Sequence, residues 1–142
     1  MSTNAARNYQ YMLDTNIVSA MVRNPHGALA HKLSGIDTST LCISIIVAAE
    51  IRFGLVKGVA KQMQLQIEAT LETIDILPLT APADKHYGEI RSYLEKRGQP
   101  ISANDLFMAA HARSLNLTLV SNNTREFERV PGLKLEDWLA TT

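Results

Sequence analysis

The sequence predicts an α/β domain with a mainly parallel central sheet that is covered by helices on both faces. Short apolar runs typical of strands alternate with runs of helical spacing, and this alternation requires right-handed crossovers between parallel strands. The 142 residues, 46% of them hydrophobic, suit one compact core. We therefore expect one domain over residues 11–139, preceded by a flexible polar extension over residues 1–10.

The first half of the chain is predicted to form two strand–helix units and a further helix. Asp14 ends the first apolar run, and the residues after it have the apolar spacing of a short helix. Ser44 follows the second run and is a favourable N-cap for a helix that carries Glu50. The predicted elements are strand 9–13, helix 15–22, strand 41–43, helix 45–55 and helix 61–72.

The second half is predicted to continue this alternation. Pro78 marks the exit of a strand, and Pro82 fits the first turn of a long helix that ends at Gly98. Asp105 lies in the first turn of the next helix. The predicted elements are strand 74–79, helix 82–97, a helical run over 106–112 and a buried strand over 117–121.

Composition and charge restrict the class of protein. The 14 basic and 14 acidic residues cancel, so any contact with nucleic acid must be local rather than driven by overall charge. The only cysteine, Cys42, lies in an apolar run, which predicts a buried side chain rather than a reactive thiol. No segment has the length and hydropathy of a membrane span or a signal peptide. We expect a cytoplasmic protein with no membrane partner.

Acidic residues are predicted to converge at the carboxyl edge of the sheet, where open parallel sheets bind ligands. Asp14 ends the first strand, the turn 121–123 follows the last predicted strand, and the helices that carry Glu50 and Asp105 can present them at the same edge. Clustered carboxylates raise one another's pKa, and a divalent cation relieves this. Oxygen ligands favour Mg²⁺ or Mn²⁺, and phosphodiester hydrolysis is the natural reaction.

Each acid also has a purely structural interpretation. Asp14 is a favourable N-cap for the helix after it, and Glu50 suits an ordinary exposed helix position. Asp105 fits the acidic end of a capping box that begins at Ser102. Their joint placement at one edge favours the metal-site interpretation.

Other polar residues point less clearly to chemistry. No serine lies in a nucleophile elbow, and Trp138 is predicted to be a core or interface anchor. None of the four histidines has zinc-site spacing; these are His26, His31, His86 and His111. Five basic residues near the predicted edge are either phosphate contacts or solvated surface: Arg52, Lys57, Arg113, Arg125 and Arg129.

Four segments together resemble a known family. They are MLDTNI (12–17), AEIRFG (49–54), NDLFMAAHA (104–112) and LVSNNTREFERVPGL (119–133). In this order and at this spacing, the chain resembles a PIN-domain ribonuclease of the VapC toxin type from about Tyr11 to Trp138, and its C-terminal stretch is especially similar to the enteric VapC group.

The resemblance implies a PIN-like α/β/α sandwich with Mg²⁺ or Mn²⁺ dependence. It also implies a homodimer, and a hetero-oligomer with a VapB-type antitoxin whose C-terminal segment lies across the active site. Similarity to the enteric group implies that the RNA substrate is the initiator tRNA(fMet), cut in the anticodon loop, where unpaired bases can be read.

Carried over by position, the resemblance makes Asp14 and Asp105 metal ligands, with Glu50 completing the metal shell directly or through water. Each would hold the ion that activates the attacking water.

The family's fourth acid falls on Asn123 here, and Glu126 lies one turn further on, so both residues are candidates for that catalytic position. We expect one metal ion in the resting site. Ser121 replaces the usual threonine, and its hydroxyl can hold a neighbouring carboxylate; Ser121 and Arg125 are assigned to positioning the substrate.

Three alternatives stay open at this point. A haloacid-dehalogenase-like phosphatase also uses an aspartate after its first strand, but it needs a second acid where this chain has Asn16. A receiver-like regulatory domain would not need Glu50 and Asp105. A PIN fold can also persist as a nonenzymatic RNA-binding module.

Overall fold

Five parallel strands form the central sheet, in the order β3-β2-β1-β4-β5. The structure is a computed structural model that describes residues 8–140. The strands are β1 (Tyr11–Leu13), β2 (Leu41–Ser44), β3 (Asp75–Leu77), β4 (Thr118–Val120) and β5 (Lys134–Glu136). The predicted mainly parallel sheet is confirmed.

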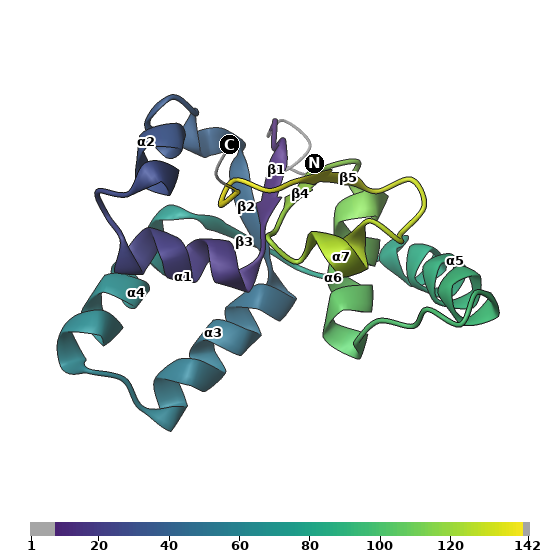
Figure 1. Ribbon diagram of the computed structural model, residues 1–142. Coiled ribbons are helices and arrows are strands. Elements are labelled where there is room, and N and C mark those ends of the chain that lie inside the picture. The colour runs from purple at the N-terminus through teal and green to yellow at the C-terminus, as the bar shows by residue number, and fades with distance from the viewer. Residues whose placement is uncertain (1–7, 141–142) are drawn as a thin grey trace, which may run out of the picture.

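Helices flank this sheet to make a three-layer sandwich. In Figure 1, α1, α2 and α4 lie to the left of the strands and α5, α6 and α7 to the right, while α3 runs downward from the end of β2. The helices are α1 (Thr15–Arg23), α2 (Ala28–Ser34), the 3-10 turn η2 (Thr38–Thr40), α3 (Ile45–Lys57), α4 (Lys61–Thr73), α5 (Ala83–Lys96), α6 (Ala103–Ser114) and α7 (Thr124–Phe127).

All the predicted strands and helices are present, with ends moved by a few residues. Ser44 caps α3 as predicted, because its hydroxyl accepts a hydrogen bond from the backbone N–H of Ile46 at 3.1 Å. The sequence did not predict α2, η2, α7 or β5. The last of these is a three-residue edge strand with no buried residue, so it carries no apolar pattern to detect.

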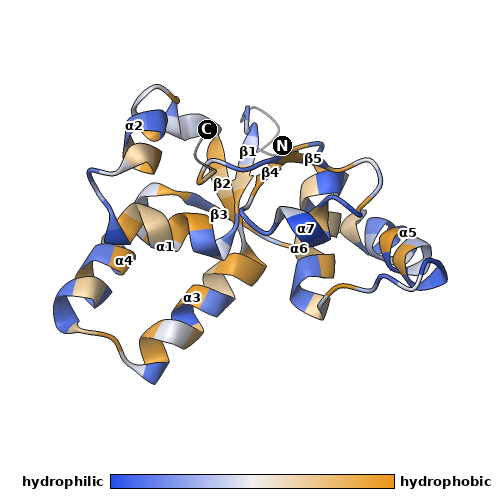
Figure 2. Ribbon diagram, viewed as in Figure 1, coloured by the Kyte–Doolittle hydropathy of each residue, from blue (hydrophilic) through white to orange (hydrophobic). Residues whose placement is uncertain are grey.

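Apolar strands form the centre of the core. Met12, Leu13, Ile43 and Leu119 are fully buried, and Figure 2 shows the hydrophobic colour concentrated on the strands and on the helix surfaces beside them. Cys42 is buried, and burial raises the pKa of its thiol to about 12, as expected for an unreactive side chain.

The two ends of the described chain join this core. Trp138 is buried and packs edge-on against Tyr11, so its predicted role as a core anchor is confirmed. Gln10 bonds through its backbone to Thr40 and Thr118, which extends the pairing of β1. Most of the extension predicted to be flexible, residues 1–7, lies outside the described residues. No helix in residues 8–140 is long and apolar enough to cross a membrane.

The strand order creates a switch point between β1 and β4. The chain moves from β1 outward through β2 and β3, and it then returns to place β4 on the other side of β1. Crossovers that leave neighbouring strands in opposite directions open a crevice at their carboxyl ends. Asp14 and Ser121 directly follow these two strands, so the fold places both at that crevice.

Candidate active site

Asp14 follows β1 at the switch point of the sheet, and both of its carboxylate oxygens are held. One accepts a hydrogen bond from the backbone N–H of Thr15 at 2.7 Å, and the other accepts from the hydroxyl of Ser121 at 2.7 Å. The residue is thus the N-cap of α1 as well as part of the acidic cluster. Only 7% of it is exposed, and this burial raises its pKa although the two hydrogen bonds oppose the shift.

Asp105 enters the same crevice from the first turn of α6. Ser102 caps this helix and accepts a hydrogen bond from the backbone N–H of Asp105, and the Asn123 amide donates to the Asp105 carboxylate at 3.3 Å. Burial, followed by the adjacent Glu126 carboxyl and the charge of Asp14, raises the pKa of Asp105 to about 7. Asp105 is therefore only partly ionised near neutral pH unless a cation offsets its neighbours.

Glu126 supplies the acidic neighbour that the sequence left undecided. It lies on the short helix α7, and its oxygen Oε2 is buried without a hydrogen-bond partner. Asn123 and Glu126 both contact Asp105: the amide donates to it, and the Glu126 carboxyl forms a hydrogen bond with it and places a like charge beside it, both of which raise the pKa of Asp105. The two candidates for the fourth position are thus neighbours in space, and the acid among them is Glu126.

Glu50 is held at the side of the crevice nearest to α1. The Thr15 hydroxyl donates to one of its oxygens at 2.7 Å, and the Asn104 amide donates to the other at 3.3 Å. Its charge is near enough to Asp14 to raise the pKa of that residue. Sequence reasoning missed Thr15 and Asn104, although each adjoins a predicted acid in the chain and carries a group able to donate to a carboxylate.

The crevice brings together residues suited to Mg²⁺, although no ready-made cage is present. Among residues 8–140, no three histidine, cysteine or acidic side chains form a metal-holding group in their present positions. Mg²⁺ commonly takes one or two carboxylates and keeps its remaining waters, so a closed cage is not needed. One oxygen of Glu126 is buried without a hydrogen-bond partner, and the pKa of Asp105 is raised. Both features indicate that a cation bound beside these two carboxyl groups would be stabilised.

Ser121 and Arg125 have different environments. Ser121 is fully buried, donates to Asp14 and accepts from the backbone N–H of Asn123 at 2.9 Å. It therefore holds a carboxylate, as predicted, and has no surface with which to touch a substrate. Arg125 is exposed on α7, next to Glu126 in the chain, so its role in positioning the substrate stays a prediction.

Arg113 corrects one sequence hypothesis. Its guanidinium forms an ion pair with Glu89 and donates to His86 and to the carbonyl oxygen of Pro131. This side chain fastens α6 to α5 and to the segment after α7. It is a structural residue rather than a phosphate contact.

The fold and the acidic crevice agree with the comparison with known families. The PIN domain model matches residues 11–133, and the chain belongs to the PIN-domain family. It is 38% identical to the tRNA(fMet)-specific endonuclease VapC of Shigella flexneri over 91% of this chain and 98% of that protein. It is 41% identical to ribonuclease VapC2 of Rickettsia felis over 90% of this chain and 97% of that protein. Within the family, the chain is a VapC toxin ribonuclease, an RNA-cleaving hydrolase.

Solved structures give the same grouping. The chain matches VapBC from Salmonella typhimurium bound to DNA with a TM-score of 0.83 and 35% identity, over 92% of this chain and 98% of that one. It matches VapBC2 from Rickettsia felis bound to a promoter DNA fragment with a TM-score of 0.80 and 38% identity, over 90% and 98% of the two chains. The predicted PIN-like sandwich is confirmed, and the phosphatase and receiver alternatives are wrong.

Proposed function

We propose that this chain is a Mg²⁺-dependent endoribonuclease that hydrolyses initiator tRNA in the cytoplasm and is neutralised by a VapB-type antitoxin. The observation that carries the metal dependence is the contact between Asp105 and Glu126 next to Asp14. Three acids in one crevice, one of them with a pKa of about 7, need a cation to be ionised together near neutral pH.

Asp14, Asp105 and Glu126 would hold the ion, and Glu50 would reach it through water. When bound, the ion lowers the pKa of a water molecule and offsets charge on the phosphodiester. Ser121 and Thr15 fix the Asp14 carboxylate, so it is oriented before any ligand arrives. Mn²⁺ has the same preference for oxygen ligands and would replace Mg²⁺.

Recognition of the RNA would rest on the rim of the crevice. Arg125 is exposed on α7, next to Glu126 in the chain, and would bind a phosphate that flanks the scissile bond. The choice of tRNA(fMet) is supported by the names of relatives from Shigella flexneri and Salmonella typhimurium, which are 38% and 35% identical to this chain. An unpaired anticodon loop would present its bases and backbone to the site.

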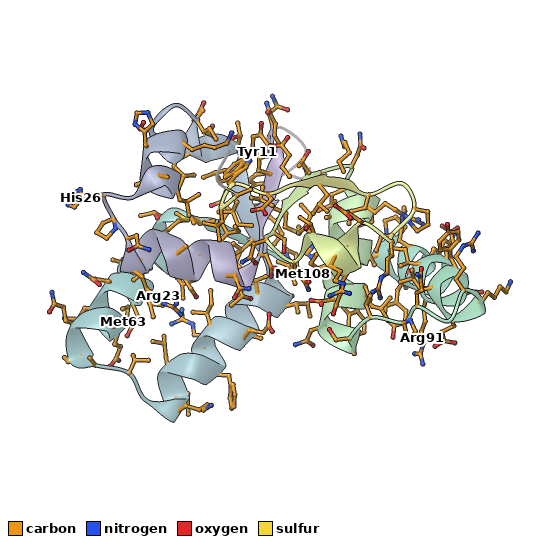
Figure 3. All side chains as sticks on the ribbon, viewed as in Figure 1. Tyr11, Arg23, His26, Met63, Arg91 and Met108 are labelled. Atoms are coloured by element: carbon orange, nitrogen blue, oxygen red, sulfur yellow. The ribbon has the colours of Figure 1, made fainter. Side chains whose placement is uncertain are left out.

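A cleft of about 560 Å³ beside the active site would receive the antitoxin. Its apolar walls come from α1, α3 and α4, and Thr15 and Glu50 lie at its active-site end. Arg23 and Met63, both labelled in Figure 3, also line it. An amphipathic C-terminal helix of a VapB-type partner would lay its apolar face here and direct a basic side chain toward the acidic crevice. The VapBC complexes among the similar structures support this kind of partner.

We also propose a homodimer within a larger toxin–antitoxin assembly. Phe53 and Val56 on α3 are 64% and 86% exposed, and large apolar side chains at such exposure are suited to burial by a partner chain. Sedimentation of the toxin alone and with its antitoxin would measure both assemblies.

Incubation with total bacterial tRNA, followed by mapping of new RNA ends, tests the substrate. Cuts confined to the anticodon loop of initiator tRNA, present with Mg²⁺ and absent with EDTA, are expected. Metal-dependent cuts in other RNAs alone would refute the substrate, and undiminished cutting in EDTA would refute the metal.

A further inference from the structure

A buried histidine connects the two helices that carry Glu50 and Asp105. His111 on α6 is 2% exposed, and its Nδ1 lies 2.8 Å from the hydroxyl oxygen of Ser44, which is fully buried. Its ring also donates to the backbone carbonyl of Pro78, just after β3. The side chain therefore joins α6 to the ends of two strands.

The hydrogen-bond partners define the tautomer of this ring. A proline backbone has no N–H and can only accept, so the ring donates to Pro78, and because Nδ1 lies against Ser44 we assign that proton to Nε2. Nδ1 then accepts from the Ser44 hydroxyl, whose oxygen in turn accepts from the backbone N–H of Ile46. Each polar atom in this chain of contacts has a partner. Burial also lowers the pKa of His111, so the ring stays neutral.

The same two helices meet again at the active site. Ser44 caps the start of α3 and contacts the later part of α6, whereas Glu50 in the middle of α3 contacts Asn104 at the start of α6. The two helices therefore run in opposite directions, joined by one buried polar contact and one at the crevice. Met108, labelled in Figure 3, is on the buried side of α6 between these contacts.

We propose that His111 is a positioning residue that, through Ser44, fixes how far α6 lies along α3 and so sets the spacing between Glu50 and Asp105. The inference rests on the proposed metal site, because the consequence of a slipped α6 would be weaker metal binding. A hydrophobic contact would hold the helices together but would not fix their relative position so narrowly, since apolar packing is not directional. A buried hydrogen bond has a short and directional optimum.

Two substitutions at the same position separate this role from general stability. His111→Asn places an acceptor near the Nδ1 position and keeps the Ser44 contact, whereas His111→Gln reaches toward Pro78 and leaves Ser44 without its acceptor. Ser44→Ala removes the same contact from the other side. Leu29→Ala on α2 removes a buried side chain far from α6, so it is the control for lost stability alone.

The first readout is Mn²⁺ binding by each folded variant without RNA, measured by electron paramagnetic resonance of the free ion. His111→Gln and Ser44→Ala should raise the Mn²⁺ dissociation constant about tenfold, while His111→Asn and Leu29→Ala should stay within about twofold of the wild type. Wild-type affinity in His111→Gln, or equal weakening in Leu29→Ala, would overturn the inference.

The second readout does not depend on the metal. The side-chain amide signals of Asn104, identified by their loss in Asn104→Ala, report the contact with Glu50 in nuclear magnetic resonance spectra. Their chemical shifts should change in His111→Gln and stay the same in His111→Asn. Unchanged chemical shifts in His111→Gln would refute the positioning role. If the wild type binds no Mn²⁺, the proposed metal site fails and these amide signals alone decide the inference.

Discussion

Ser121 donates a hydrogen bond to Asp14 over 2.7 Å and joins the carboxyl ends of β4 and β1 at the switch point of the sheet. The two residues are far apart in the sequence, and both are buried. Because the bond stabilises the ionised carboxylate, it opposes the effect of burial on the pKa of Asp14. The serine thus keeps this carboxylate oriented and closer to its ionised form.

Ser121→Ala should lower the rate of RNA cleavage about tenfold, because Asp14 loses the partner that orients it. Ser121→Thr retains the hydroxyl and should stay near the wild-type rate. Single-turnover cleavage at saturating Mg²⁺ measures both, with the exposed Ser92→Ala on α5 as control. Equal rates for the alanine variant and the wild type would contradict the role of the hydroxyl.

Asp105→Asn should stabilise the metal-free protein at pH 8. The pKa of Asp105 is raised to about 7 in the folded state, so its contribution to stability is full below about pH 4, the range where the unfolded carboxyl titrates, and is lost as the pH rises through about 7. Removing the charge should raise the melting temperature by about 3 °C at pH 8, which corresponds to about 1 kcal/mol in the free energy of unfolding. The increase should be smaller at pH 5. Thermal unfolding in EDTA measures this. A lower melting temperature for Asp105→Asn than for the wild type at pH 8 would show that the Asp105 carboxylate is not repelled by its acidic neighbours.

Glu126→Gln should reduce cleavage about tenfold, less than a substitution at Asp14, because it removes one carboxylate but leaves the others in place. It should also move the pKa of Asp105 back toward its usual value, since Glu126 is the nearest like charge. Asn123→Ala removes the amide that donates to Asp105 and should have a smaller effect. Wild-type rates in both variants would remove these residues from the active site.

Gly54→Leu should weaken binding of the cognate VapB-type antitoxin by tenfold or more, while RNA cleavage by the free toxin is retained. Gly54 lines the cleft, and a Cβ added there meets nothing within 4 Å, so the new side chain would occupy the cleft without distorting α3. A helical residue in place of glycine should also add about 0.5–1 kcal/mol of stability.

Gly88→Leu on α5 is the matched control for the cleft variant, because it too is a helical glycine with open space and lies outside the cleft. Isothermal titration of each variant with the antitoxin provides the comparison. Undiminished affinity in Gly54→Leu would place the antitoxin elsewhere.

The sequence predicted the elements that have strong apolar patterns and the acids that end or begin them. Asp14 and Asp105 could be placed because each directly adjoins a predicted strand or helix. The choice between Asn123 and Glu126 could not be made, because it depends on α7, a helix of four residues that has too few turns to show periodicity.

Contacts between segments that are distant in the chain could not be predicted from the sequence either. The hydrogen bonds of Glu50 with Thr15 and Asn104 join three helices, and the ion pair of Arg113 with Glu89 removes one of the candidate phosphate contacts. Neither follows from local pattern, because both depend on how the helices pack across the sheet.

The most direct test of the central claim is cleavage of total bacterial RNA by the purified, antitoxin-free protein and by Asp14→Asn, with Mg²⁺ and with EDTA. Circular dichroism would first establish that both proteins are folded. We predict discrete new RNA ends from the wild type with Mg²⁺, none in EDTA, and a rate about a hundredfold lower in Asp14→Asn, since this variant loses a charge from the proposed metal site. Wild-type cleavage by the folded variant would show that the crevice at the β1–β4 switch point is not the catalytic centre.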